Sequence, residues 1–246
     1  FLAEGSKALN EALSVPGCVV EVFATPHATT RYAELHYAVV TAGLLWLVVD
    51  EGALESLSDT VTPQGLVATC RFLDRPLTDV LASSSPTTDG ARLVAVCADV
   101  RDPGNAGTVI RCADAAGADA VVLTGNSVDP YNGKTVRATV GSLFHLPLSV
   151  EDDPAATVAT LGAFGLTVLA ADGAGEIDLD EAVAGGLLAR PTAWLFGNEA
   201  WGLPQQLADL ADHRVRIPIH GRAESLNLST AAAICLYASA RAQRSR

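Results

Sequence analysis

The chain has 246 residues, of which 49% are apolar and 18% are charged, and its formal net charge is −12. This length allows one large domain or two modest ones, and the apolar content excludes a disordered protein. No apolar run approaches the roughly 20 residues that cross a bilayer, so we expect no membrane partner. The chain begins at Phe1 rather than Met, and we expect that residues before it are missing.

Charge is distributed unevenly along the chain. Residues 1–89 hold 4 Lys and Arg against 11 Asp and Glu, whereas residues 214–246 hold 6 Arg against Glu224 alone. The acidic total disfavours a nucleic-acid partner, but a local basic segment can attract a polyanion because salt screens charges beyond about 10 Å. Arginines near a helix end explain the same segment equally well, so charge leaves the question open.

The cysteines and histidines show no metal-ligand spacing. The cysteines are scattered and none forms a C-x-x-C pair, so they indicate buried thiols in a reducing cytoplasm rather than disulfides or a zinc site. We therefore expect a cytoplasmic protein that needs no metal. The cysteines are Cys18, Cys70, Cys97, Cys112 and Cys235, and the histidines are His27, His36, His145, His213 and His220.

Residues 1–82 predict a small α/β domain. Helical spacing appears around Ala8 and Ala12, and strands are expected at Cys18–Phe23, Leu45–Val49 and Gly65–Cys70. A small, polar, proline-bearing stretch follows, which predicts a linker at residues 83–90.

Residues 91–246 alternate more regularly between strand and helix patterns, which predicts a parallel sheet covered on both faces. The expected strands are Leu93–Ala98, Ala120–Leu123, Leu166–Ala171, Thr192–Phe196 and Val215–Ile219, and the expected helices are Ala106–Ala116, a short one near Pro204, and Leu228–Ala242.

A first polar motif, Asp99–Arg111, joins a predicted buried strand to a helix. Asn105 is the expected N-cap, and Gly104 and Gly107 let the backbone approach a ligand. Arg111 shares its helix with apolar residues, and a guanidinium in such surroundings needs an anionic partner. An ordinary capped helix with a salt-bridged arginine is the alternative, and the lack of a G-x-G-x-x-G pattern disfavours a dinucleotide-type site.

The second motif is Leu195–Pro204, in which a buried strand stops at Gly197. A tight loop then presents Asn198 and Glu199, and Gly202 ends the turn. Open α/β sheets bind ligands at the carboxyl ends of their strands, which favours a site here. A connecting loop with a surface acid is the alternative.

The third motif, Ile217–Ala232, places Ser225 and Asn227 at the mouth of a long helix, where free N–H groups favour an anion. A Ser or Asn cap is the alternative. Each motif alone is ambiguous, but three in order, all at strand ends, favour a functional site.

Together these motifs resemble the signatures of the SpoU (TrmH-like) family of SPOUT RNA 2′-O-ribose methyltransferases. Within the family, the chain looks closest to the ribosomal-RNA methyltransferases of the thiostrepton-resistance type. Ala200 stands where the family often has glycine, and a methyl group there is tolerable. The segments that resemble the signatures are Asn105-x-Gly107-Thr108-x-x-Arg111, Gly197-Asn198-Glu199-x-x-Gly202 and Ile217-Pro218 followed by Glu224-Ser225-Leu226-Asn227.

The resemblance implies a SPOUT fold, an α/β fold with a parallel sheet and a C-terminal trefoil knot, at residues 91–246. It implies a small L30e-like α/β domain that binds the RNA substrate at residues 1–82. It also implies S-adenosylmethionine as the cofactor and a homodimer with the active site at the subunit interface. The expected substrate is 23S ribosomal RNA, with transfer RNA as the alternative.

By the same resemblance, two sets of residues form the active site. Arginine does not deprotonate in proteins, so we expect Arg111 to clamp a phosphate and polarise the 2′-hydroxyl rather than to act as a base. The other catalytic residues position Arg111 and the ribose. The catalytic set is Arg111, Asn105, Glu199, Ser225 and Asn227, and the cofactor-binding set is Leu195, Gly197, Asn198, Ile217, Ile219 and Leu226.

Two other functions compete with this interpretation. One is a catalytically idle knotted protein that binds RNA or assists assembly, although binding alone would not require the polar residues of all three motifs. The other is a methyltransferase that acts on a small molecule or a protein, which an acidic surface would suit.

Overall fold

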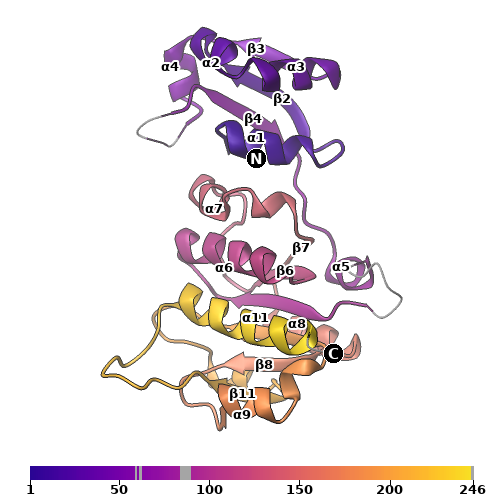
Figure 1. The fold of residues 1–246 in the computed structure, drawn as a ribbon, viewed down its shortest axis with the longest axis vertical. Helices are drawn as coiled ribbons and strands as arrows, with labels where there is room; N and C mark the ends of the chain where they lie inside the picture. Colours follow the sequence, from indigo (N-terminus) through magenta and orange to yellow (C-terminus); the bar gives the residue numbers. More distant parts are fainter. Residues whose placement is uncertain (59, 61–62, 84–89, 245–246) are drawn as a thin grey trace.

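The computed structural model describes residues 1–58, 60, 63–83 and 90–244, and it contains two sheets (Figure 1). The first sheet has the strand order β1-β4-β2-β3, and the second has the order β7-β6-β5-β10-β8-β11-β9. Of the linker predicted at residues 83–90, Ser83 is the last residue of α5 and residues 84–89 lie outside the described residues.

The first sheet is mixed, because β4 runs antiparallel to β1 and β2, whereas β2 and β3 are parallel. The three strands predicted in this region are confirmed as β2, β3 and β4, each within one residue at either end. The elements are β1 (Leu2–Glu4), α1 (Ser6–Leu13), β2 (Val19–Ala24), α2 (Pro26–Arg31), α3 (Ala33–Thr41), β3 (Leu45–Val48), α4 (Glu51–Glu55), β4 (Leu66–Cys70) and α5 (Leu77–Ser83).

Every strand pair in the second sheet is parallel, as predicted. The sequence pattern missed its two short edge strands, β7 and β9. Its strands are β5 (Leu93–Ala98), β6 (Ala120–Thr124), β7 (Leu148–Glu151), β8 (Thr167–Ala171), β9 (Ile177–Asp178), β10 (Thr192–Phe196) and β11 (His213–Arg216). Its α-helices are α6 (Pro103–Ala116), α7 (Gly133–Thr139), α8 (Pro154–Ala163), α9 (Leu179–Ala184), α10 (Gln205–Ala208) and α11 (Leu228–Arg244), with 3₁₀ turns η1 (Ser142–Phe144) and η2 (Leu187–Ala189).

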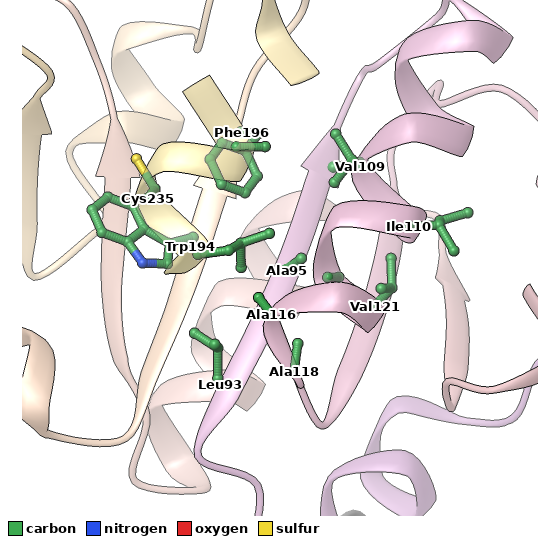
Figure 2. Packing of buried hydrophobic residues seen from close by; sticks show 14 of the residues in the cluster. Leu93, Ala95, Val109, Ile110, Ala116, Ala118, Val121, Trp194, Phe196 and Cys235 are labelled. Carbon is green, nitrogen blue, oxygen red and sulfur yellow. The ribbon is translucent and has the colours of Figure 1, made fainter. Parts of the chain in front are cut away.

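The central strands are buried on both faces, which explains their continuous apolar sequences. Along β10, Trp194 and Phe196 point to the face covered by α6 and α11, whereas Leu195 points to the opposite face. Figure 2 shows Trp194 and Phe196 beside Cys235 of α11. The Trp194 Nε1–H donates to the Ser239 hydroxyl at 2.8 Å, so a buried hydrogen bond fixes α11 on the sheet.

Helix α6 begins earlier than the sequence predicted. Asp102, not Asn105, is its N-cap, because the Asp102 carboxylate accepts the Asn105 N–H at 2.8 Å and Pro103 occupies the first helical position. The helix ends as predicted at Gly117, whose φ of 70° is left-handed. Asn105 therefore lies inside the first turn, and its side chain is available for other contacts.

The strand predicted at Val215–Ile219 ends at Arg216, so the prediction of its length was wrong. It pairs with β8 only as far as Val215 and with the two-residue β9 at its end. Beyond Arg216 neither neighbour extends far enough to continue the ladder, which frees Ile217–Ile219 for the cavity described below. Helix α11 continues two residues beyond its predicted end.

The first sheet and the second sheet belong to two parts of the chain, and side chains of the first part contact side chains of the second. Phe144, which follows α7, is buried in the core of the first part and stacks with Phe1 at 6.0 Å between ring centroids. The Tyr131 hydroxyl donates to Asp74 at 2.6 Å and accepts the Leu73 N–H at 2.7 Å. These contacts hold the segment that leaves the first sheet against the second part.

His145 lies between two carboxylates of this contact. Its Nδ1 lies 2.8 Å from Asp114 of α6 and its Nε2 lies 3.1 Å from Glu11 of α1. The hydrogen bond with Asp114 is the main cause that raises the pKa of His145 above its ordinary value of 6.5, and Glu11 adds to it. The protonated ring therefore joins the two parts of the chain.

We expect this contact to depend on pH. Because the folded pKa is raised, the contact stabilises fully below about pH 6.5 and its contribution is lost as pH rises through the folded pKa. His145→Gln is expected to lower Tm by about 1–2 °C at pH 5.5, since half-exposed ion pairs contribute little, and by less at pH 8.5. Thermal melts at both pH values measure this, with the exposed His27→Gln as control. An equal deficit at both pH values would contradict the assignment.

Among the described residues, four of the five cysteines are buried and Cys112 is half-buried, and none forms a disulfide. Burial raises the pKa of Cys97 to about 12 and also raises the pKa of Cys235, so both thiols stay protonated. The prediction of buried thiols is confirmed for these four. In the part of the chain that the structure describes, no helix has the length and apolar content to cross a bilayer.

Candidate active site

A cavity of about 590 Å³ opens at the carboxyl ends of β8, β10 and β11, in the size range of small-molecule sites. These three strands are neighbours in the sheet, so the loops that leave them meet at one edge. The wall combines apolar side chains, glycines, three acids and Arg216, which is paired with Asp178. The lining residues are Ala171–Gly173, Phe196–Ala200, Gly202, Val215–Ile219, Glu224–Leu226, Leu228 and Ala231.

The loop after β10 is a tight turn between Asn198 and Gly202. Their backbones exchange two hydrogen bonds of 2.9 Å, and Gly202 has a left-handed φ of 71°. The buried Asn198 side chain accepts the Ala200 N–H at 2.8 Å and donates to the Asp99 carbonyl at 2.7 Å. Asn198 thus organises its own loop and ties it to the loop after β5.

Gly197 lies where two backbone segments come together. A Cβ atom at this position would lie 2.4 Å from the Gly202 carbonyl carbon and 2.5 Å from the Leu203 nitrogen. Both are backbone atoms and cannot move aside as a flexible side chain can. Gly197 is therefore required for room, and the turn cannot close with a larger residue.

A chain of polar side chains connects all three sequence motifs. The Asn227 side-chain Nδ2–H donates to the Asn105 side-chain oxygen Oδ1 at 3.1 Å, and the Asn105 side-chain Nδ2–H donates to Glu199 at 3.4 Å. Asn227 also caps α11, since its oxygen accepts the Ser229 N–H at 2.9 Å. The structure therefore brings three predicted catalytic residues into one network, although they lie up to 122 residues apart in sequence.

Glu199 connects the loop after β10 to the start of α6. Its carboxylate accepts the backbone N–H groups of Arg101 at 3.4 Å and Asp102 at 3.2 Å. These N–H groups precede the helix, where the positive end of the helix dipole favours a negative charge. The carboxylate is thereby fixed at the cavity wall, between the cavity and the Asn105 amide.

Arg111 is exposed and lies apart from this network. Among the described residues its guanidinium has no ion-pair or hydrogen-bond partner, and Arg111 is not in the cavity wall. It follows Asn105 by six residues, which places it about 9 Å further along the helix and on a different face. The guanidinium predicted to need an anionic partner is thus free to meet one from outside the chain.

The remaining predicted residues fall into two groups. Five of the six predicted cofactor-binding residues line the cavity, as do the predicted catalytic residues Glu199 and Ser225. Leu195 does not line it, because its side chain is fully buried in the core on the opposite face of β10. The next residue of β10, Phe196, lines the cavity instead, and the three motifs did not predict it.

The loop after β8 was also missed. Ala171, Asp172 and Gly173 line the cavity. The Ala171–Gly173 segment stands at the carboxyl end of a central strand, so the rule that located the other motifs could have located this one. Within the described residues, no group of three or more His, Cys, Asp and Glu side chains could hold a metal ion.

Comparisons with known proteins assign the family. The SpoU rRNA Methylase family matches residues 92–237, and the family described as RNA 2'-O ribose methyltransferase substrate binding matches residues 2–76. The chain belongs to the SpoU rRNA methylase family. The family resemblance expected from the three motifs is confirmed, and this SpoU chain joins one polar residue of each motif, Asn105, Glu199 and Asn227, in one network.

Relatives and solved structures match almost the whole chain. The 23S rRNA (guanosine(2553)-2'-O)-methyltransferase RlmP of Bacillus subtilis is 35% identical over 240 residues, which are 96% of this chain and 87% of that protein. The SpoU methyltransferase AviRb of Streptomyces viridochromogenes in complex with AdoMet matches with a TM-score of 0.84 and 26% identity, over 100% of this chain and 91% of that one. An AdoMet-bound rRNA methyltransferase of Sinorhizobium meliloti matches with a TM-score of 0.78 and 31% identity, over 98% and 87%.

Proposed function

We propose that this protein transfers a methyl group from S-adenosylmethionine to a ribose 2′-hydroxyl of RNA, with 23S ribosomal RNA as its substrate. The observation that carries the proposal is the hydrogen-bonded network of Asn227, Asn105 and Glu199 at the wall of the cavity. The names of the matched relatives support ribosomal RNA as the substrate class.

The cavity wall fits S-adenosylmethionine. Ile219 and Leu226 are 39% and 37% exposed, and both line the cavity, so they offer apolar surface that an adenine ring would cover. Asp172, Glu199 and Glu224 provide negative charge in the same wall, which suits a ligand with a positive sulfonium. Gly197, Asn198 and Ile217 would complete the binding surface. When bound, S-adenosylmethionine supplies an electrophilic methyl group.

The chain's own residues would align the ribose and assist loss of its proton. Asn105 and Asn227 hold each other in place, and Ser225 offers a hydroxyl in the cavity wall. Arg111 binds the phosphate beside the target ribose and polarises the 2′-hydroxyl, whose proton leaves to phosphate or water. Alignment of this kind supplies several kcal/mol of the barrier reduction.

The active site is completed by a second copy of the chain. In one copy Arg111 does not line the cavity, and α11 exposes the apolar side chains of Ile234 and Tyr237. The Tyr237 hydroxyl donates to the Ala115 carbonyl of α6 at 3.3 Å, which places Tyr237 one helical turn from Arg111. A homodimer through α6 and α11 would bury these side chains and carry Arg111 of one copy toward the cavity of the other.

The order of the strands supports a trefoil knot at the C-terminus. Strand β10 is inserted between β5 and β8, and β11 between β8 and β9, so the last two strands pass between strands formed earlier. The chain then returns through residues 217–227 to α11, which lies beside α6 (Figure 1). Within this arrangement, residues 91–246 form the methyltransferase domain.

Residues 1–76 would form an L30e-like domain that binds the RNA substrate. The sequence prediction of a first domain at residues 1–82 and a linker at residues 83–90 also placed α5 (Leu77–Ser83) outside the second domain, but Leu77, Val80 and Leu81 pack into the core of the second part. The match of residues 2–76 to a substrate-binding family supports this division. A protein that modifies ribosomal RNA works where ribosomes are made, so we place it in the cytoplasm.

Transfer of labelled methyl groups tests the proposal. The protein is incubated with methyl-labelled S-adenosylmethionine and, separately, unmodified 23S ribosomal RNA and transfer RNA, and each RNA is digested to nucleosides. We expect a labelled 2′-O-methyl nucleoside from 23S RNA alone. Label only in transfer RNA would select the alternative substrate. If calorimetry shows that the cofactor binds but neither RNA is labelled, RNA methylation is refuted. If the cofactor does not bind, the result favours an idle RNA-binding protein.

A further inference from the structure

A stacked arginine and tryptophan stand at the edge of the cavity. Arg101 belongs to the loop after β5 and Trp201 to the turn after β10, and the Arg101 guanidinium lies 5.2 Å from the centre of the Trp201 ring. Trp201 is 54% exposed, whereas Trp194 is buried and Trp46 donates to the Thr29 hydroxyl. Trp201 is thus the most exposed of the three tryptophans, and a neighbouring cation fixes its orientation.

The position of this pair is set by the same contacts that build the active site. The Arg101 N–H donates to Glu199, whose carboxylate accepts the Asn105 amide. Ala200 and Gly202, on either side of Trp201, both line the cavity. Trp201 therefore belongs to the turn that forms part of the cavity wall, and its partner Arg101 is hydrogen-bonded to Glu199 of the network that would hold the ribose.

Arg101 and Trp201 together provide the chemistry that recognises an unpaired nucleotide. An indole ring offers a flat apolar surface on which a base stacks, and a guanidinium adds positive charge and a second planar surface. The chain as a whole is acidic, with a net charge of −12, so general attraction to RNA is weak. A local stacking contact would supply affinity that the total charge does not.

We propose that Arg101 and Trp201 form a platform on which one base of the RNA substrate stacks, beside the nucleotide whose ribose is methylated. The platform rests on the proposed function for its role, but the stacking itself can be measured separately. A single-stranded or flipped-out nucleotide is the required ligand, because a base inside a duplex has no free face.

Tryptophan fluorescence tests the stacking without any methylation. Single-stranded oligoadenylate of 12 nucleotides is expected to quench the fluorescence of the wild type and of Trp46→Phe, whereas Trp201→Phe loses this quenching. Heparin, a polyanion without bases, is expected to leave the fluorescence unchanged. The proposal would be overturned if heparin quenched the fluorescence equally, or if quenching persisted in Trp201→Phe. It would also be overturned if a second copy covered Trp201, so that acrylamide could not reach the ring and oligoadenylate had no effect.

Steady-state kinetics test the role of the platform in methylation. Trp201→Ala is expected to raise KM for 23S RNA by about 10-fold or more, with kcat and affinity for S-adenosylmethionine within about 2-fold of wild type. Trp201→Phe is expected to recover most of the loss, because phenylalanine keeps a stacking surface. Phe164→Ala serves as the matched control, since Phe164 is an exposed aromatic residue that precedes β8, at the opposite edge of the sheet.

The two tests separate failure of the platform from failure of the proposed function. A fall in kcat at unchanged KM for RNA would overturn the platform while leaving methylation in place. A wild type that methylates neither RNA would refute the proposed function, and the fluorescence result would still decide whether a base stacks on Trp201.

Discussion

Arg111→Ala is expected to reduce RNA methylation by about 10²–10³-fold or more while affinity for S-adenosylmethionine changes less than about 2-fold. The reason is geometric. Arg111 is exposed, lies outside the cavity wall and has no polar partner among the described residues, so its removal leaves the cofactor cavity and the fold intact. What would be lost is the cation that we propose to meet the RNA phosphate and to polarise the 2′-hydroxyl.

Initial rates at saturating cofactor, together with calorimetry for cofactor binding, measure the two quantities separately. Arg190→Ala is the matched control, because Arg190 is also an exposed arginine but precedes β10, at the edge of the sheet opposite the cavity. Arg111→Lys is expected to stay strongly impaired, since an ammonium lacks the planar fork that binds phosphate bidentately. Near-normal turnover by Arg111→Ala would remove Arg111 from the mechanism.

The sequence predicts the central part of this fold because its strands are buried on both faces. Leu93–Ala98 and Thr192–Phe196 are continuous apolar runs, and the structure has both with the predicted bounds. The edge strands β7 and β9 were missed, since they are short and partly exposed and lack such runs. A strand that is buried on both faces can therefore be predicted from one sequence, whereas a short, partly exposed edge strand cannot.

The order of strands in the sheet was beyond sequence reasoning. The insertion of β10 between β5 and β8 joins residues that no local pattern relates, and it places the three loops of the cavity side by side. The motif residues could be predicted because ligands bind at the carboxyl ends of strands. Which motif residues contact each other, such as Asn105 and Asn227, depends on the topology of the sheet. The wrong assignment of Asn105 as N-cap has the same origin, because Asp102 and Asn105 are both good caps in sequence.

Gly197→Ala is expected to lower affinity for S-adenosylmethionine by about 100-fold or more and to lower Tm by several degrees. The added methyl group would overlap the Gly202 carbonyl and the Leu203 nitrogen, so the Asn198–Gly202 turn must open. Overpacking of this kind costs about 1–3 kcal/mol, which corresponds to roughly 2–4 °C per kcal/mol for a chain of this size. The opened turn would also displace Glu199 from the wall of the cavity.

Gly221→Ala is the control, because a Cβ there meets no atom within 4 Å and Gly221 lies in the loop that follows β11, outside the cavity wall. Calorimetry at a temperature where both variants are folded separates loss of binding from loss of folding. Full cofactor affinity in Gly197→Ala would mean that the turn after β10 is not part of the cofactor site. We expect the folded Gly197→Ala variant to lose affinity for S-adenosylmethionine and the Arg111→Ala variant to keep it. This pair of results would separate the half of the site that holds the methyl donor from the half that acts on the RNA.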